Sequence, residues 1–216
     1  MTRELLNITS YTSEAQTRNC CQFLISTRIA RGFPQELGME AAEYRSSFGN
    51  AIEDIVSCGS APEGALLGLV DERIPFARQL ELLGITLDPG IFYKIKHRSG
   101  EQPHAVWLKV FSPNEGPFLN SDNYQEAVTS LSACMRPATP FEGISTDTAA
   151  ILARGFVSLP GGDYEVPGTL SGGSTRLDTL CLDNYLGKPR ISRVRFAEMD
   201  YLVGMLAVFK QYVARD

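Results

Sequence analysis

Histidines, paired cysteines and catalytic signature motifs are scarce in this chain of 216 residues. Only two histidines are present, which leaves few ways to build a His-rich metal site or a Ser-His-Asp arrangement. The sequence has no Gly-x-Gly-x-x-Gly, Walker, His-Glu-x-x-His, Gly-x-Ser-x-Gly or calcium-loop motif. The residues therefore point to no familiar catalytic class, and the sequence by itself does not say what the protein does.

Long apolar runs and an excess of positive charge are also missing. No stretch approaches the roughly eighteen consecutive apolar residues of a membrane span. Lys and Arg total 20 against 25 Asp and Glu, a net charge of −5, so we expect no nucleic-acid partner. The first ten residues lack the pattern of a signal peptide, and the five scattered cysteines form no Cys-x-x-Cys pair. These features predict a cytoplasmic protein with reduced thiols.

Helical periodicity recurs along the chain. Ser13 followed three residues later by Gln16 is a capping-box pattern, which predicts the start of a helix. Apolar residues at steps of three and four predict helices over 14–31, 40–56, 122–135 and 197–214. Two shorter helices are expected over 75–83, which starts with a proline, and over 146–154, which ends before a glycine.

Strand patterns fall mostly between these helices. Residues 65–70 form a short apolar run, and 91–96 and 106–111 alternate with period two around a polar stretch, which predicts an antiparallel hairpin. Further strands are expected over 156–159, 165–170 and 177–182. Helices and strands are grouped rather than alternating, which favours a single α+β domain over residues 1–216. We expect N-terminal helices, the central hairpin, further strands in a mixed or antiparallel sheet, and a C-terminal helix packed on the body.

The expected C-terminal helix is unusually apolar. Its apolar stripe consists of Met199, Leu202, Leu206, Phe209 and Val213. Val203, Ala207 and Val208 widen that stripe beyond what one buried face needs. We therefore expect a second side of this helix to be covered by the hairpin or by another subunit, which makes a homo-oligomer possible.

Both histidines flank the turn of the expected hairpin. His97 ends one strand, His104 begins the next, and Glu101 lies between them. Two imidazoles and a carboxylate would suit zinc or iron. Polar residues also occupy hairpin tips simply because tips face water, and we favour that interpretation. We expect no bound metal and no cofactor.

The densest basic run lies near the C-terminus, at Lys188, Arg190, Arg193 and Arg195. In an extended segment Arg193 and Arg195 share one face, where they could hold a phosphate or carboxylate. The alternative is an edge strand protected from aggregation by its charge. A glycine-rich segment, 171–176, resembles an anion-binding nest in composition and ends in Arg176. The candidate ligand-binding residues are therefore Arg176, Arg190, Arg193 and Arg195, and no catalytic residue is identified.

Turn and strand motifs of this chain resemble those of one known family. The second half contains Pro140-Phe141-Glu142-Gly143, Leu159-Pro160-Gly161-Gly162, Val166-Pro167-Gly168-Thr169-Leu170, Leu177-Asp178 and Gly187. The first half contains a helix ending in Ala30-Arg31-Gly32-Phe33-Pro34 and the segment Ile74-Pro75-Phe76. Over about residues 15–190 the chain is similar to a bacterial family known only as a domain of unknown function. The resemblance implies no activity.

Three functional hypotheses follow. A sizeable fold without catalytic motifs, with one basic stretch and glycine-rich loops, favours a binding or accessory protein for a small molecule or peptide. The alternative is a cofactor-independent enzyme of specialised metabolism, such as a cyclase, lyase or isomerase that uses ordinary acid and base side chains. The third hypothesis is a module that binds a protein partner through the C-terminal helix.

Overall fold

A computed structural model gives the structure of the chain. It describes residues 13–88, 94–95, 102–112, 115–116, 126, 131, 134–159, 164–165, 178–195 and 203–209. At 94–95, 164–165, 178–179, 193–195 and 203 it describes the backbone alone.

The described residues from Ser13 to Ser57 form four helices. Helix α1 (Glu14–Ala30) begins with the expected capping box, in which the Gln16 backbone N–H donates to Ser13 Oγ (3.3 Å) and the Ser13 N–H to Gln16 Oε1 (3.1 Å). Gly32, at φ +88°, separates α1 from α2 (Phe33–Glu36). The helix expected over 40–56 is two helices, α3 (Ala41–Ser46) and α4 (Gly49–Ser57). Ser47 lies at the break, where its hydroxyl donates to the Tyr44 carbonyl (2.7 Å) and competes with the helical backbone.

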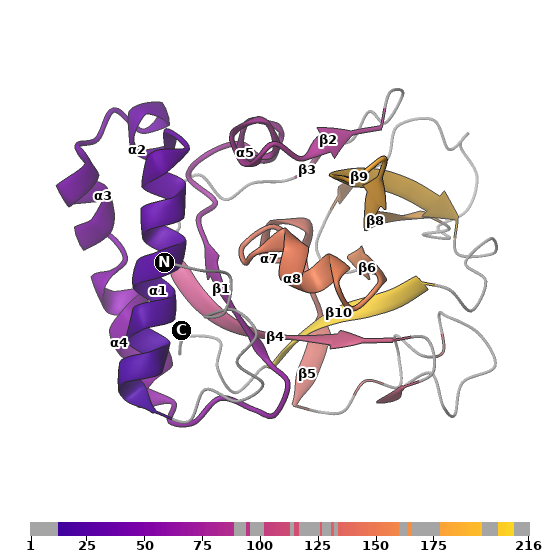
Figure 1. Cartoon of the computed structure of the whole chain (residues 1–216), viewed down its shortest axis with the longest axis horizontal. Coiled ribbons are helices and arrows are strands. Elements are labelled where there is room, and N and C mark those ends of the chain that lie inside the picture. Colours follow the sequence, from indigo (N-terminus) through magenta and orange to yellow (C-terminus); the bar gives the residue numbers. More distant parts are fainter. Residues whose placement is uncertain are drawn as a thin grey trace.

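The described strands form one large, curled mixed sheet and one small ribbon (Figure 1). The sheet order is β1-β4-β10-β6-β8-β9-β2, with β5 also paired to β10. Its strands are β1 (Leu66–Val70), β2 (Thr86–Leu87), β4 (His104–Phe111), β5 (Met135–Pro137), β6 (Phe156–Leu159), β8 (Asp178–Tyr185), β9 (Lys188–Arg195) and β10 (Val203–Phe209). The ribbon pairs β3 (Lys94–Ile95) with β7 (Tyr164–Glu165). Because β10 runs parallel to β6 and β2 parallel to β9, while the other pairs are antiparallel, the α+β class with a mixed sheet is confirmed.

Short helices lie among the strands of the described part. Helix α5 (Phe76–Leu83) follows Pro75 and ends at Gly84, as the sequence predicts. Helix α8 (Thr148–Leu152) is shorter than the expected helix over 146–154. Helix α7 (Pro140–Gly143) lies between the helices expected over 122–135 and 146–154, and β5 includes the final residue of the first of these. Most of that expected helix lies outside the described residues.

The prediction of a C-terminal helix is wrong over residues 203–209. These residues form β10, in the middle of the sheet between β4 and β6. A central strand is buried on both faces, so it carries a continuous apolar run that a helical template also fits. The helix surface proposed for a homo-oligomer or a protein partner is therefore absent from this segment.

The prediction of a central hairpin is also wrong. Strand β4 exists, but its two neighbours are β1 and β10 rather than residues 91–96. The described part of that partner segment, β3, pairs instead with β7. Strand β4 pairs with β1 over residues 104–108 and with β10 over residues 108–111, and both partners are distant in sequence. The period-two pattern carries no information about which strand will pair.

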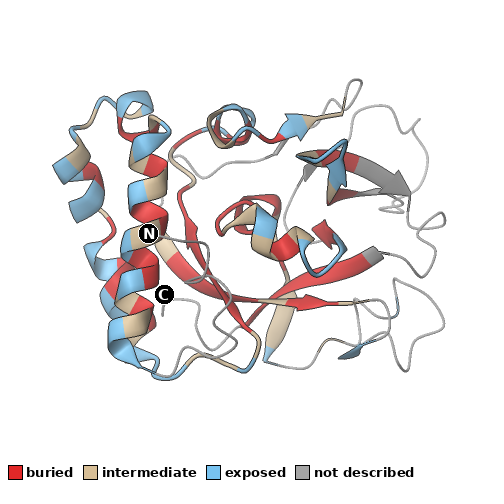
Figure 2. Ribbon diagram, in the orientation of Figure 1, coloured by how far each residue is buried: buried red, intermediate tan, exposed pale blue. Residues whose placement is uncertain are grey.

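Buried residues line the strands of the sheet (Figure 2). Most belong to two large apolar clusters, one on each face of β4, and a small third cluster contains Phe111, Met205 and Ala207. Alternate residues of β4 divide between the two large clusters, with Val106 and Leu108 in one cluster and Ala105 and Trp107 in the other. The first cluster packs against α5, α7 and α8, and the second against α1 to α4. Within the described part, β1 is a terminal strand of the sheet, so its outer edge needs partners other than a strand.

Candidate functional site

The outer edge of β1 is covered by an arginine from the last turn of α1. The Arg28 guanidinium donates through Nη2 to the carbonyl oxygen of Leu69 and, at 3.4 Å, to that of Ser145. The Leu69 N–H in turn donates to the Ser145 carbonyl (3.0 Å). The close approach of the loop at Ser145 requires Gly68, since a Cβ there would lie 2.1 Å from Ser145 Oγ. Arg28 therefore joins α1 to the sheet edge and to the loop between α7 and α8.

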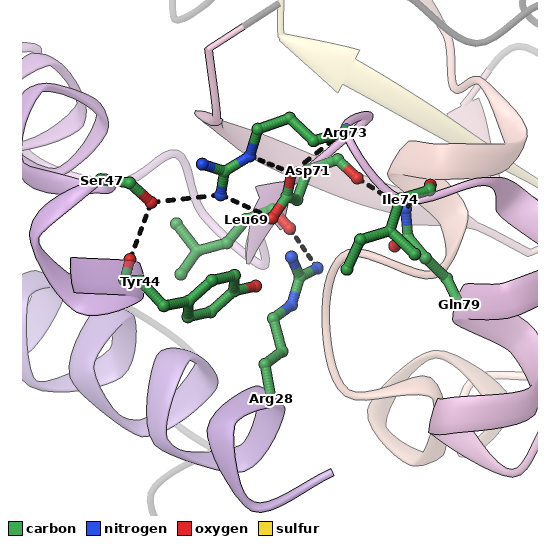
Figure 3. Close-up of polar contacts among 8 residues, drawn as sticks. All are labelled: Arg28, Tyr44, Ser47, Leu69, Asp71, Arg73, Ile74 and Gln79. Carbon is green, nitrogen blue, oxygen red and sulfur yellow. Dashed lines mark hydrogen bonds and ion pairs between the residues drawn. The ribbon is translucent and has the colours of Figure 1, made fainter. Parts of the chain in front are cut away.

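Arg28 belongs to a buried group of polar side chains (Figure 3). Its neighbours are Tyr44 from α3, together with Asp71 and Arg73 from the turn after β1. The Asp71 carboxylate accepts two hydrogen bonds from the Arg73 guanidinium, from Nε at 2.8 Å and from Nη2 at 2.9 Å. Burial alone would raise the pKa of Asp71, but Arg73 and Arg28 outweigh it and hold that pKa below its usual value.

Tyr44 lies between these charges with its hydroxyl fully buried. Burial raises the pKa of Tyr44 to about 12, while nearby Arg28 lowers it and Asp71 raises it further. No described residue meets the distance and angle of a hydrogen bond to this hydroxyl, although Arg28 and Asp71 lie close enough to shift its pKa. Its ring is held by an edge contact with Phe48, at 5.2 Å between centroids, and by the Arg73 guanidinium, 5.7 Å from its centroid. Tyr44 is therefore neutral at physiological pH, and no general-base role follows from its geometry.

The group of Arg28, Tyr44, Asp71 and Arg73 contains two guanidinium groups and a single carboxylate. Arg73 and Asp71 form a bidentate pair, whereas Arg28 has no ion pair within the described part of the chain. Its Nη1 is buried and has no hydrogen-bond partner there, although the guanidinium lies 5.2 Å from the Phe33 ring centroid. One positive charge of the group is therefore not matched by a carboxylate.

A cavity of about 150 Å³ lies beside Arg28. Its walls come from α1, from the end of α5 and from the loop leading into α8, and they include Arg28, Arg31 and Asp147. Hydroxyl groups from Thr27 and from the loop between α7 and α8 add polar lining, and apolar side chains complete the walls. The cavity thus combines a buried cation with two further charged residues.

Arg31 and Asp147 are held by backbone contacts. Arg31 is exposed, and its Nη1 donates to the Leu82 carbonyl (3.2 Å). Asp147 caps α8 by accepting a hydrogen bond from the Ala149 N–H (2.9 Å). Neither side chain forms an ion pair with another described residue. Both charges remain available to a bound molecule.

Among the ligand-binding residues predicted from sequence, Arg190 is the one whose side chain the structure describes. Its guanidinium donates to both carboxylate oxygens of Asp183 (2.9 Å each) and lies 4.4 Å from the Tyr185 ring centroid. A carboxylate already occupies the bidentate position that an anionic ligand would take. Anion binding at this residue stays a prediction.

The other predicted ligand-binding arginines are described less fully. Arg193 and Arg195 lie in β9, as the extended pattern predicts, opposite Leu180 and Asp178 of β8. The side chains of both arginines, and the whole of Arg176, lie outside the described residues.

The hypothetical metal ligands are not brought together by the described structure. His104 opens β4 and pairs with Val70 of β1, while His97 and Glu101 lie outside the described residues. The described part contains no group of three or more His, Cys, Asp or Glu side chains arranged to hold a metal ion. Within it, no helix is both long enough and apolar enough to cross a membrane.

The segment 140–143, which carries the family resemblance, has packing roles. Glu142 is buried and forms a bidentate pair with Arg136, including one contact of 2.8 Å from Nη1. It also completes a capping box with Thr139. A Cβ on Gly143 would lie 2.5 Å from the Leu159 side chain, so glycine permits close packing against β6.

Comparison with known proteins gives no match to this chain: no family model, no curated protein and no solved structure is detectably similar. The likeness to an uncharacterised bacterial family therefore stays a prediction.

Arg28, Arg31 and Asp147 are not among the ligand-binding residues predicted from the sequence. A signal for Arg28 was present, because the buried face of α1 runs through Cys21, Leu24 and Ile25 to Arg28 at steps of three and four. A charged residue in register with an apolar stripe indicates a buried charge with a specific environment. Arg31 and Asp147 carry no comparable signal, because arginine at a helix end and aspartate before a helix are ordinary capping choices.

Proposed function

We propose that the protein binds a small anionic molecule in the cavity beside Arg28. The observation that carries this proposal is a buried guanidinium in the wall of a cavity of about 150 Å³, which forms no ion pair with a carboxylate of the described residues. A cavity of roughly this volume accommodates a group the size of benzene. The proposal keeps the class expected from sequence, a small-molecule binding protein without a metal, and moves the anion site from the basic run of β9 to the end of α1.

Electrostatics supports an anionic ligand. Removing an ion from water costs several kcal/mol unless a counter-charge and hydrogen bonds compensate. Two carbonyl oxygens, the Phe33 ring and the nearby Asp71 carboxylate, which is already paired with Arg73, compensate Arg28 in part. A ligand carboxylate or phosphate in the cavity would supply the missing counter-charge, and Arg31 at the wall would add a charge-assisted contact.

Arg28 also has a structural role, since it covers the edge of β1. That role requires the hydrogen bonds to Leu69 and Ser145 but not a cavity beside the side chain. Arg31 therefore tests the binding proposal better than Arg28, because Arg31 is exposed and its replacement leaves the sheet edge intact.

The test compares Arg31→Gln with Arg154→Gln by isothermal titration calorimetry, using small carboxylates and inorganic phosphate as probes. Arg154 is a matched control, since it is also exposed and donates Nη1 to a backbone carbonyl, that of Gly64 (2.8 Å), but does not line the cavity. Loss of a charge-assisted contact predicts binding weaker by about tenfold or more in Arg31→Gln alone. Equal affinities in the parent and both variants, or no binding by the parent, would refute the proposal.

A further inference from the structure

The cavity beside Arg28 carries ionised groups of both signs. Arg31 and Asp147 both line it, one from the end of α1 and the other from the cap of α8. Arg28 is a second cation in the wall of the same cavity. Oppositely charged side chains at one small cavity commonly neutralise each other, yet Asp147 and Arg31 form no ion pair with any described residue.

A simple anion would use only part of this arrangement. A lone carboxylate or phosphate gains from the arginines but meets repulsion from the Asp147 carboxylate in the same cavity. A ligand that carries a cation beside its anion avoids this repulsion and gains a second charged contact. The combination of Arg31 and Asp147 therefore favours a molecule with both charges over a molecule with one.

Apolar residues complete the walls of the cavity. Phe23 and Leu24 contribute from α1, Leu83 from α5 and Ile144 from the loop before α8. The volume of about 150 Å³ limits the ligand to a small molecule. These walls suit a short hydrocarbon side chain and exclude a large one.

We propose that the ligand is a small aliphatic α-amino acid or a close analogue. Its carboxylate faces Arg31 and the charge of Arg28, its ammonium group faces Asp147, and its side chain contacts the apolar walls. This inference rests on the proposed anion-binding function and specifies the ligand class of the same site.

The experiment titrates L-alanine, L-valine and L-leucine into the full chain. Each amino acid is compared with the carboxylic acid that lacks its amino group and the amine that lacks its carboxylate. At least one amino acid should bind about tenfold more tightly than both of its counterparts, because it makes two charged contacts rather than one.

Asp147→Asn separates charge from structure. Asparagine caps helices as well as aspartate does, so the hydrogen bond to the Ala149 N–H is kept while the negative charge is lost. The variant should bind the amino acid only as tightly as the parent binds the matching carboxylic acid, and its affinity for that acid should not fall. Asp54→Asn is the control, since Asp54 is an exposed residue of α4 away from the cavity, and its replacement should change nothing.

The outcomes distinguish this inference from the proposed function. If the carboxylic acids bind as tightly as the amino acids, or if Asp147→Asn leaves amino-acid binding unchanged, the amino-acid proposal is wrong while the anion site stands. An amine that binds as tightly as its amino acid also refutes the amino-acid proposal. If neither a carboxylate-bearing probe nor inorganic phosphate binds, both proposals fail together.

Discussion

Replacing Gly204 with alanine tests the largest difference between the sequence prediction and the structure. Gly204 lies in β10, opposite Val157 of β6. A Cβ at this position would lie 2.3 Å from the backbone oxygen of Phe111 in β4 and 3.3 Å from that of Phe156 in β6. The first distance is far shorter than any normal contact, and both obstacles are backbone atoms that cannot rotate away.

The expected loss of stability follows from the displacement of β10 that the added Cβ requires. Overpacking a well-ordered core costs about 1–3 kcal/mol, and sometimes more. Here β10 must also separate from β4 by close to 1 Å, which weakens ladder hydrogen bonds with a net value of about 1 kcal/mol each. We therefore expect Gly204→Ala to lower the free energy of unfolding by about 3 kcal/mol or more, a large share of the roughly 5–15 kcal/mol of a typical domain.

The assay is urea denaturation followed by circular dichroism and by fluorescence of Trp107, the only tryptophan, which is fully buried. Gly49→Ala is the matched control, because Gly49 begins α4 and a Cβ there meets nothing within 4 Å. That control should be neutral or more stable than the parent by up to about 1 kcal/mol.

If residues 197–214 formed a helix, Gly204→Ala would raise the free energy of unfolding instead of lowering it. Alanine in the interior of a helix is more favourable than glycine by about 1 kcal/mol. If Gly204→Ala is as stable as the parent or more stable, the placement of β10 between β4 and β6 is wrong.

Three further predictions concern Asp71, Tyr44 and Leu186. Asp71→Asn should cost about 3–5 kcal/mol at pH 7, because it leaves buried guanidinium charge uncompensated. The folded-state pKa of Asp71 is lowered. Its contribution to stability is therefore present above the unfolded pKa of about 4 and is lost as the pH falls through the folded pKa. As the pH is lowered, the free energy of unfolding should fall more steeply for the parent than for Asp71→Asn. Tyr44→Phe should stay within about 1 kcal/mol of the parent or exceed its stability in urea, because its buried hydroxyl has no described partner; a larger loss would show that the hydroxyl bonds to Arg28 or Asp71. Leu186 is 86% exposed at φ +52°, so Leu186→Asn should raise the melting temperature by relieving about 1 kcal/mol of strain, and an unchanged or lower value would contradict this.

The elements that the sequence predicts correctly are those with local causes. Helix α1 begins at a capping box formed by residues three apart, and α5 begins after Pro75 and ends at Gly84. The strand after residue 65 is a short apolar run without helical length. Each of these signals acts between neighbours in the chain, so a reading of the sequence detects it directly.

The errors concern partners distant in sequence. Residues 203–209 form a strand because they pair with β4 on one side and β6 on the other. Their apolar run by itself fits a helical pattern as well. The hairpin prediction failed for a related reason, since residues that alternate correctly for a strand do not specify which strand they will pair with. Tertiary contacts decide both questions.

The candidate site was hidden for the same physical reason. The Arg28 guanidinium contacts Leu69 and Ser145, which are 41 and 117 residues away in the chain. Each segment brings to the cavity residues that are ordinary in their local context, such as an arginine at a helix end and an aspartate at a cap. Their combination, rather than any one spacing, places a buried positive charge beside a cavity whose wall holds a carboxylate that forms no ion pair with any described residue. A sequence motif reveals chemistry that is carried by residues close together in the chain. A binding site assembled from single charges on separate elements leaves no such motif. The scarcity of motifs in this chain is therefore compatible with a specific ligand.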